Sequence, residues 1–226
     1  MTKTEGTTNF LEKASVFLLL ATAFLLPIFF IPGGAISVDF GKTSFLVLFA
    51  MTALIFWLAG NIRRGDISIP KNPIIFSIFA ILVFSVASSL LSPSIKTSFW
   101  GAGFEGGTAL VIISLCVLGF LFSSLFKSRE RVILFYSLLA VSSLLIFIFQ
   151  LLNIFVTPDS ALFGLFGSKT ANLLGKWNDL SVLAGLQAVL SLLIIEFFAL
   201  KKVFRIAVYL IFFLAILFLA VTNFYL

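Results

Sequence analysis

Residues 132–156 read VILFYSLLAVSSLLIFIFQLLNIFV, an uninterrupted apolar stretch without a single charged side chain. A helix needs about 20 mostly apolar residues to cross the hydrocarbon core of a membrane, which is about 30 Å thick. Inside that core the backbone amides and carbonyls have to pair within the helix, because lipid offers them no hydrogen-bond partners. The stretch therefore predicts a membrane-spanning α-helix.

Six further segments are long and apolar in the same way: 14–31, 43–62, 74–92, 106–126, 180–200 and 203–226. Hydrophobic residues make up 61% of the 226-residue chain and charged residues only 11%, whereas soluble domains carry about 25% charged residues. The predicted fold class is all-α, a polytopic integral membrane helical bundle with about seven transmembrane helices. We expect residues 1–226 to form a single transmembrane domain, and we expect Pro27 to kink the first span.

Positive charge is distributed unevenly between alternate loops. Eleven of the 15 lysines and arginines lie on one side, in the N-terminal tail and in the loops 63–73, 127–131 and 200–205. The other side, with the loops 32–42, 93–105 and 157–179, carries four. Cytoplasmic loops are the ones enriched in lysine and arginine, so the N-terminus is predicted to be cytoplasmic. The net charge of +6 then indicates orientation in a membrane, and no nucleic acid partner is expected.

The chain lacks the residues that several kinds of catalysis and metal binding need. The chain has no histidine, and its one cysteine, Cys116, lies within an apolar run. We find no closely spaced carboxylate pair, no phosphate-binding glycine loop and no cluster of metal ligands. No metal and no cofactor are therefore expected. The last residues, 220–226, are still apolar membrane sequence, so we interpret the chain as the N-terminal part of a larger membrane protein.

The third outer loop holds the first group of candidate binding residues: Lys169, Lys176, Trp177, Asn178 and Asp179. Asn178 or Asp179 is expected to be the N-cap of the sixth span. Free N–H groups at that helix start, with the two lysines nearby, would hold an anionic group such as a phosphate. The alternative is a capped helix with a tryptophan anchored at the membrane interface.

The second outer loop holds two more candidates, Lys96 and Trp100. Trp100 would stack on a sugar or anchor at the level of the lipid headgroups. Lys96 would meet a diphosphate or extend to the phosphates of membrane lipid.

Polar residues also occur inside the predicted spans. We expect interhelical hydrogen bonds from Gln150, Asn153 and Gln187. Glu196 is predicted to lie close to the cytoplasmic interface, near Lys201 and Lys202. The serines near the end of the third span are expected to allow close helix packing; they are Ser85, Ser88, Ser89 and Ser92.

The order of these features resembles the N-terminal half of the O-antigen ligase and O-antigen polymerase family of bacterial envelope enzymes. The resemblance rests on Ser92-Pro93, on Phe99-Trp100-Gly101 and on Glu105-Gly106-Gly107, which match that family's outer loop after its third span. It also rests on 175–180, which is similar to an element that opens a later span, although the commoner Asn-Pro-Asn is replaced here by Trp177-Asn178-Asp179.

The resemblance implies a metal-independent membrane glycosyltransferase that acts in the assembly of cell-envelope polysaccharide. Such an enzyme moves a glycan from an undecaprenyl-diphosphate carrier to an acceptor at the periplasmic face of the bacterial inner membrane. Its expected partners are the undecaprenyl-diphosphate-linked glycan and membrane lipid. The family's catalytic arginines and histidine belong mainly to its later half, so no catalytic residue is carried over and this fragment is expected to be inactive alone.

Two other functions are open from the residues themselves. In a transporter or channel subunit, Gln150, Gln187 and Glu196 would line a pathway across the membrane. In a non-catalytic membrane assembly protein, the outer loops would bind no ligand.

Overall fold

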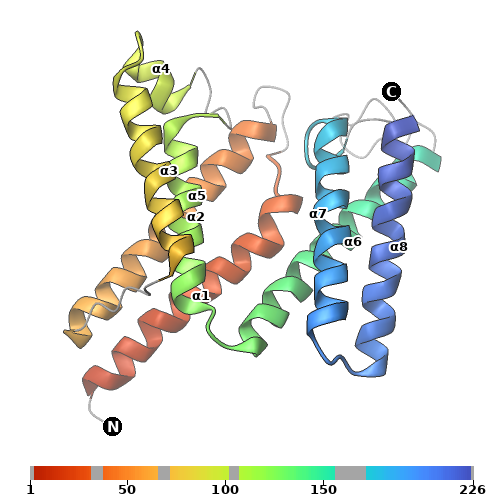
Figure 1. Cartoon of the computed structure of the whole chain (residues 1–226), viewed down its shortest axis with the longest axis horizontal. Coiled ribbons are helices and arrows are strands. Elements are labelled where there is room, and N and C mark those ends of the chain that lie inside the picture. The colour runs from red at the N-terminus through yellow and green to blue at the C-terminus, as the bar shows by residue number, and fades with distance from the viewer. Residues whose placement is uncertain (1–2, 32–37, 66–71, 102–106, 156–171, 225–226) are drawn as a thin grey trace. The chain divides into compact units, whose positions relative to one another are not determined.

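The computed structural model describes residues 3–31, 38–65, 72–101, 107–155 and 172–224. Within these ranges the chain folds into helices and contains no β-strand (Figure 1). The helices are α1 (Lys3–Ile28), α2 (Val38–Arg64), α3 (Pro73–Leu90), α4 (Ile95–Trp100), α5 (Ala109–Leu125), α6 (Arg129–Phe155), α7 (Trp177–Phe197) and α8 (Lys202–Phe224).

Six of these helices are long and apolar enough to cross a membrane, namely α1, α2, α3, α6, α7 and α8. The remaining predicted span, 106–126, corresponds to α5, which is apolar but has only 17 residues. It begins at Ala109, after its N-cap Thr108, and so omits the first residues of the predicted span 106–126. The prediction of an all-α polytopic membrane bundle is confirmed.

Two ion pairs that join α1, α2 and α6 indicate the direction in which α5 runs relative to α3. The Glu12 carboxylate of α1 lies 3.1 Å from Arg64 Nη1 at the end of α2 and 3.6 Å from Arg131 Nη1 at the start of α6. The end of α2 and the start of α6 are therefore at the same level. Since α3 leaves that level, α5 has to return to it. It therefore runs antiparallel to α3, as expected for a further crossing.

Helix α1 differs from its predicted span at both ends. It begins at Lys3, well before residue 14, and it ends at Ile28, directly after Pro27. A proline ring removes one backbone donor and clashes with the carbonyl four residues earlier. Ile31 also precedes Pro32, and the residue before a proline is disfavoured in the helical conformation. The helix therefore ends after Pro27, where we had expected it to continue with a kink.

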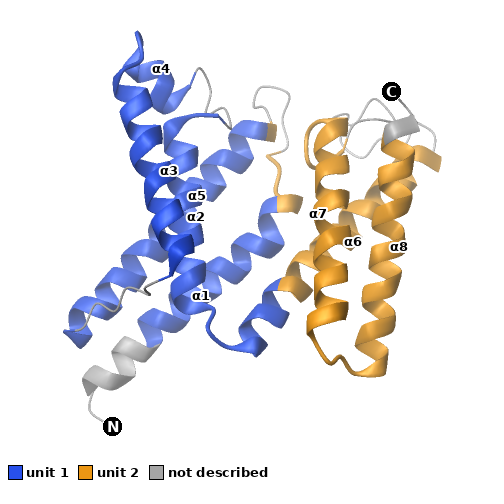
Figure 2. Cartoon of the chain, in the orientation of Figure 1, with its two compact units in different colours: residues 1–26, 39–135 blue, residues 27–38, 136–226 orange. Residues whose placement is uncertain are grey.

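The chain divides into two compact units (Figure 2). Unit 1 comprises residues 1–26 and 39–135, and unit 2 comprises residues 27–38 and 136–226. Helix α6 contributes to both units, because the division falls between Phe135 and Tyr136. The expectation of a single transmembrane domain stays a prediction.

Unit 1 is built on a core that joins α1, α2 and α5. Its buried residues are Leu19, Ala53, Trp57, Leu121, Leu125 and Phe126. The Ser15 hydroxyl donates to the carbonyl oxygen of Ala53 at 3.0 Å, which ties α1 to α2. Helices α3 and α5 approach closely at Gly119, where an added Cβ would lie 3.1 Å from Ile78 Cδ1. A side chain at position 119 would therefore require Ile78 to shift slightly.

Unit 2 packs α7 against α8 and against the second half of α6. One cluster is centred on Phe147 of α6, whose ring stacks on Phe218 of α8 with centroids 4.7 Å apart. A second cluster includes Tyr136, Ile194 and Val208. The small residues Ala184 and Ala215 are fully buried in the first cluster, which lets the helices approach closely.

Candidate functional site

A short helix, α4, forms at the predicted outer end of unit 1, within the segment that the sequence analysis treated as a loop. Ser94 is its N-cap and Gly101 its C-cap, and Gly101 has a φ of 68°, a left-handed conformation that favours glycine. The Gly101 N–H donates to the Thr97 carbonyl at 2.8 Å. Pro93 between two serines, followed by a glycine after Trp100, is the sequence signal that would have found this helix.

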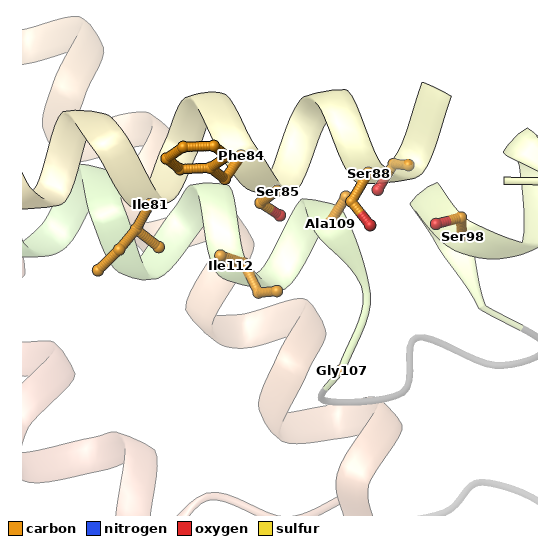
Figure 3. A pocket seen from close by; sticks show the side chains of 9 residues that line it. Ile81, Phe84, Ser85, Ser88, Ser98, Gly107, Ala109 and Ile112 are labelled. Atoms are coloured by element: carbon orange, nitrogen blue, oxygen red, sulfur yellow. The ribbon is translucent and has the colours of Figure 1, made fainter. Parts of the chain in front are cut away.

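A groove of about 460 Å³ lies between the end of α3, α4 and the start of α5. It is lined by Ile81, Phe84, Ser85, Ser88, Ser89, Ser98, Gly107, Ala109 and Ile112. Figure 3 shows Ser85 and Ser88 on α3 and Ser98 on α4 around it. The volume falls in the range of about 300–1,000 Å³ that is usual for ligand pockets. Ser85, Ser88 and Ser89 thus line this groove, and the close helix packing expected of them and of Ser92 stays a prediction.

The candidates Lys96 and Trp100 both belong to α4. Trp100 is 52% exposed, so much of its ring surface is open to a ligand or to lipid. Lys96 is also exposed. Because successive helix residues are turned by about 100°, Lys96 and Ser98 are about 200° apart around α4. Ser98 lines the groove, so Lys96 lies on the opposite face of the helix.

In unit 2, Asn172, which is not among the predicted site residues, organises the turn that leads into α7. Its side-chain oxygen accepts from the N–H groups of Leu174 at 2.9 Å and Gly175 at 3.0 Å. Its side-chain amide donates to the Lys176 carbonyl at 3.0 Å. Gly175 has a φ of 121°, which explains why a glycine stands there. An asparagine three residues before a glycine was the signal for this turn.

Four candidates from the third outer loop lie at the start of α7. The helix begins at Trp177 with Lys176 as its N-cap, so neither Asn178 nor Asp179 is the N-cap that we expected. Asp179 Oδ2 accepts from the Lys176 N–H at 3.0 Å. A side chain three residues inside the helix thus satisfies the donor at its start. The Asp179 carboxylate would also repel an anion bound at the start of α7.

Trp177 is half-buried and packs against the unit 2 core cluster that contains Leu173 and Leu180. The side chains of Lys176 and Asn178 are exposed. Lys169 lies outside the described residues. The structure therefore brings together Lys176, Trp177, Asn178 and Asp179 within unit 2. Lys96 and Trp100 belong to unit 1.

A second set of polar side chains is buried inside unit 2. The Ser143 hydroxyl lies 3.4 Å from Gln187 Oε1, and the hydroxyls of Tyr136 and Ser191 lie 3.0 Å apart. The interhelical hydrogen bond expected of Gln187 is thus confirmed, between α6 and α7. Glu196 near the end of α7 is exposed.

The described residues contain no group of three or more histidine, cysteine, aspartate or glutamate side chains able to hold a metal ion. The fold defines the class: a multi-pass helical membrane protein. No family model, no curated protein and no solved structure matches the chain.

Proposed function

We propose that this chain is the N-terminal membrane portion of a lipid-linked glycan ligase or polymerase of the bacterial inner membrane. Its reaction is the transfer of a glycan from an undecaprenyl-diphosphate carrier at the periplasmic face. The proposal starts from the sequence resemblance to the O-antigen ligase and polymerase family. The structural observation that supports it is the α3–α4–α5 arrangement, because two of the segments that carry the resemblance, Ser92-Pro93 and Phe99-Trp100-Gly101, flank or form α4.

The surface of α4 suits the polar end of such a carrier. Trp100 presents an exposed ring, and aromatic rings of this kind offer a large apolar face together with a polar edge at the membrane interface. Lys96 on the same helix adds a positive charge for a diphosphate. In unit 2, exposed Lys176 is a second positive charge at a predicted outer helix end.

The transporter alternative has less support from the described residues. It requires a charged side chain that faces the interior of the bundle, since such residues mark ion and substrate pathways. Glu196 is exposed near the end of α7. Gln187 is fully buried, and its oxygen already has Ser143 as a neighbour.

The proposal is tested with a photoreactive undecaprenyl-diphosphate oligosaccharide added to the purified chain in lipid nanodiscs. We expect cross-linking to α4 that falls several-fold in Lys96→Ala and Trp100→Ala. Lys127→Ala is the matched control, because Lys127 is exposed at the predicted cytoplasmic end. Equal labelling of all four proteins would contradict the proposal. In cells, disruption of the gene should abolish one envelope polysaccharide, and an unchanged polysaccharide profile would also contradict it.

A further inference from the structure

Three helices of unit 1 bring two arginines against one carboxylate. Arg64, the last residue of α2, has its Nη1 3.1 Å from one oxygen of the Glu12 carboxylate on α1. Arg131 of α6 has its Nη1 3.6 Å from the other oxygen. One carboxylate neutralises only one of two guanidinium groups, so these three side chains together keep one positive charge.

Neutral acceptors orient both guanidinium groups. Arg64 Nη2 donates to Asn61 Oδ1 at 3.2 Å, and Arg131 Nη1 donates to the Leu125 carbonyl at the end of α5 at 2.6 Å. A guanidinium has five N–H donors. Within the described residues, the contacts to Glu12, Asn61 and Leu125 therefore leave other N–H groups on each arginine. The side chains of Arg64 and Arg131 are 41% and 38% exposed, so a ligand can reach them.

Asn61 adds a buried amide beside Arg64. The residue is 6% exposed, and its Nδ2 has no hydrogen-bond partner among the described residues. Its Oδ1 bonds to Arg64, so the N–H groups of the same amide lie close to the guanidinium. Buried polar groups in folded proteins almost always have a partner. An unpaired amide donor next to a surplus of guanidinium charge favours an anion at this point.

The charge of the surrounding segments has the same sign. On this side of unit 1, the segments 1–13, 63–73 and 127–131 contain eight lysines and arginines and four acidic residues. The count includes every residue of these segments, so the surplus of four positive charges also holds for side chains outside the described ranges. Such a surface attracts anionic groups and repels the ammonium group of a zwitterionic lipid headgroup.

The two arginines lie at the level of lipid headgroups. The predicted span 43–62 ends two residues before Arg64, and the apolar stretch 132–156 begins directly after Arg131. Leu134 follows Arg131 by three residues, which places it on the same face of α6, one turn deeper. It is 48% exposed. A phosphate at the arginines would therefore continue into an acyl chain along α6, which favours a phospholipid over a soluble anion.

We propose that Arg64 and Arg131 bind the phosphate of an anionic membrane phospholipid of the phosphatidylglycerol class. The guanidinium groups donate paired hydrogen bonds to the phosphate oxygens. Glu12 and Asn61 hold the arginines in position, and one acyl chain lies along Leu134. This inference does not depend on the proposed glycan transfer, since its residues lie at the membrane level opposite to α4.

The experiment uses the full chain in phosphatidylcholine nanodiscs that contain a phosphatidylglycerol with a diazirine near the ester end of one acyl chain. After illumination, mass spectrometry identifies the labelled peptides. We expect labelling at the end of α2 and the start of α6. Unlabelled phosphatidylglycerol should displace it, and inorganic phosphate in the buffer should not. Labelling should fall about fivefold in Arg64→Gln and in Arg131→Gln.

Arg63→Gln is the matched control. It removes the same charge at the same level, but Arg63 is turned by about 100° around α2 from Arg64, and it is exposed. Losses in Arg64→Gln and Arg131→Gln with labelling retained in Arg63→Gln support the inference. An equal loss in Arg63→Gln would overturn it, because a basic surface without a defined site would then explain the labelling.

Three further results would also overturn the inference. They are unchanged labelling in both arginine variants, equal labelling by a phosphatidylcholine probe with the same diazirine, and displacement by inorganic phosphate, which would indicate a site for a soluble anion. Circular dichroism of each variant verifies that the helices are retained, so that a loss of labelling reports on the site.

Discussion

At the scale of single residues, Asn172 does more for local structure than its neighbours Asn178 and Asp179, which the sequence analysis favoured. It is 2% exposed, and its side chain bonds to three backbone groups between Leu174 and Lys176. A short amide side chain mimics a peptide group and can therefore replace the backbone partners that a turn lacks. The turn that leads into α7 is therefore held by the Asn172 side chain, in addition to the bond from the Lys176 N–H to Asp179 at the helix start.

We predict that Asn172→Ala destabilises this turn by about 2–3 kcal/mol, because each hydrogen bond contributes about 1 kcal/mol net. Amide hydrogen exchange at Leu174 and Gly175 should become faster by a corresponding factor. Asn178→Ala is the control, since that side chain is exposed, and it should leave exchange at Leu174 and Gly175 unchanged. Equal protection in Asn172→Ala and the native chain would show that the turn is held by other contacts.

At the scale of helices, the apolar runs predicted which segments are helical, because lipid requires every spanning backbone to be hydrogen-bonded internally. They predicted the helix ends less well. Pro27 ended α1 where a kink was expected, and α7 began at Trp177 ahead of the expected cap. Helix α4 was missed although Pro93 and Gly101 mark its ends, and its groove was missed because it is created by three segments meeting in space. Composition and periodicity do not predict which segments lie next to one another in the fold.

Helices α1, α2 and α6 meet at Glu12, which contacts Arg64 and Arg131 at the predicted cytoplasmic side. We predict that Glu12→Gln lowers stability by no more than about 1 kcal/mol, because all three side chains are partly exposed to solvent. The difference should shrink at high ionic strength, where charges are screened. The measurement is the midpoint of unfolding by sodium dodecyl sulfate in mild detergent, at low and at high salt.

Glu130→Gln is the matched control for that measurement, because Glu130 is exposed in the first turn of α6 and no ion pair involves it among the described residues. It should lose only its weak interaction with the helix dipole. A loss in Glu12→Gln that exceeds about 1 kcal/mol and does not depend on salt would mean that Glu12 acts through something other than these two arginines.

At the scale of the whole molecule, the number of crossings depends on α5. Its 17 residues span about 26 Å, slightly less than the hydrocarbon core of about 30 Å. The pairing of Glu12 with both Arg64 and Arg131 nevertheless requires α5 to return to the level from which α3 departs. Seven crossings follow if α5 traverses the bilayer, and six if it does not.

We predict that residues on either side of α5 face opposite sides of the membrane. In a Cys116→Ala background, which removes the only native thiol, a membrane-impermeant maleimide should label Ser94→Cys in intact cells. It should label Ser128→Cys only after permeabilisation, since Ser128 lies between α5 and α6. Labelling of both from outside would mean that α5 does not cross. Reversed labelling would keep the crossing but invert the orientation derived from the lysine and arginine distribution, so the two conclusions are tested separately.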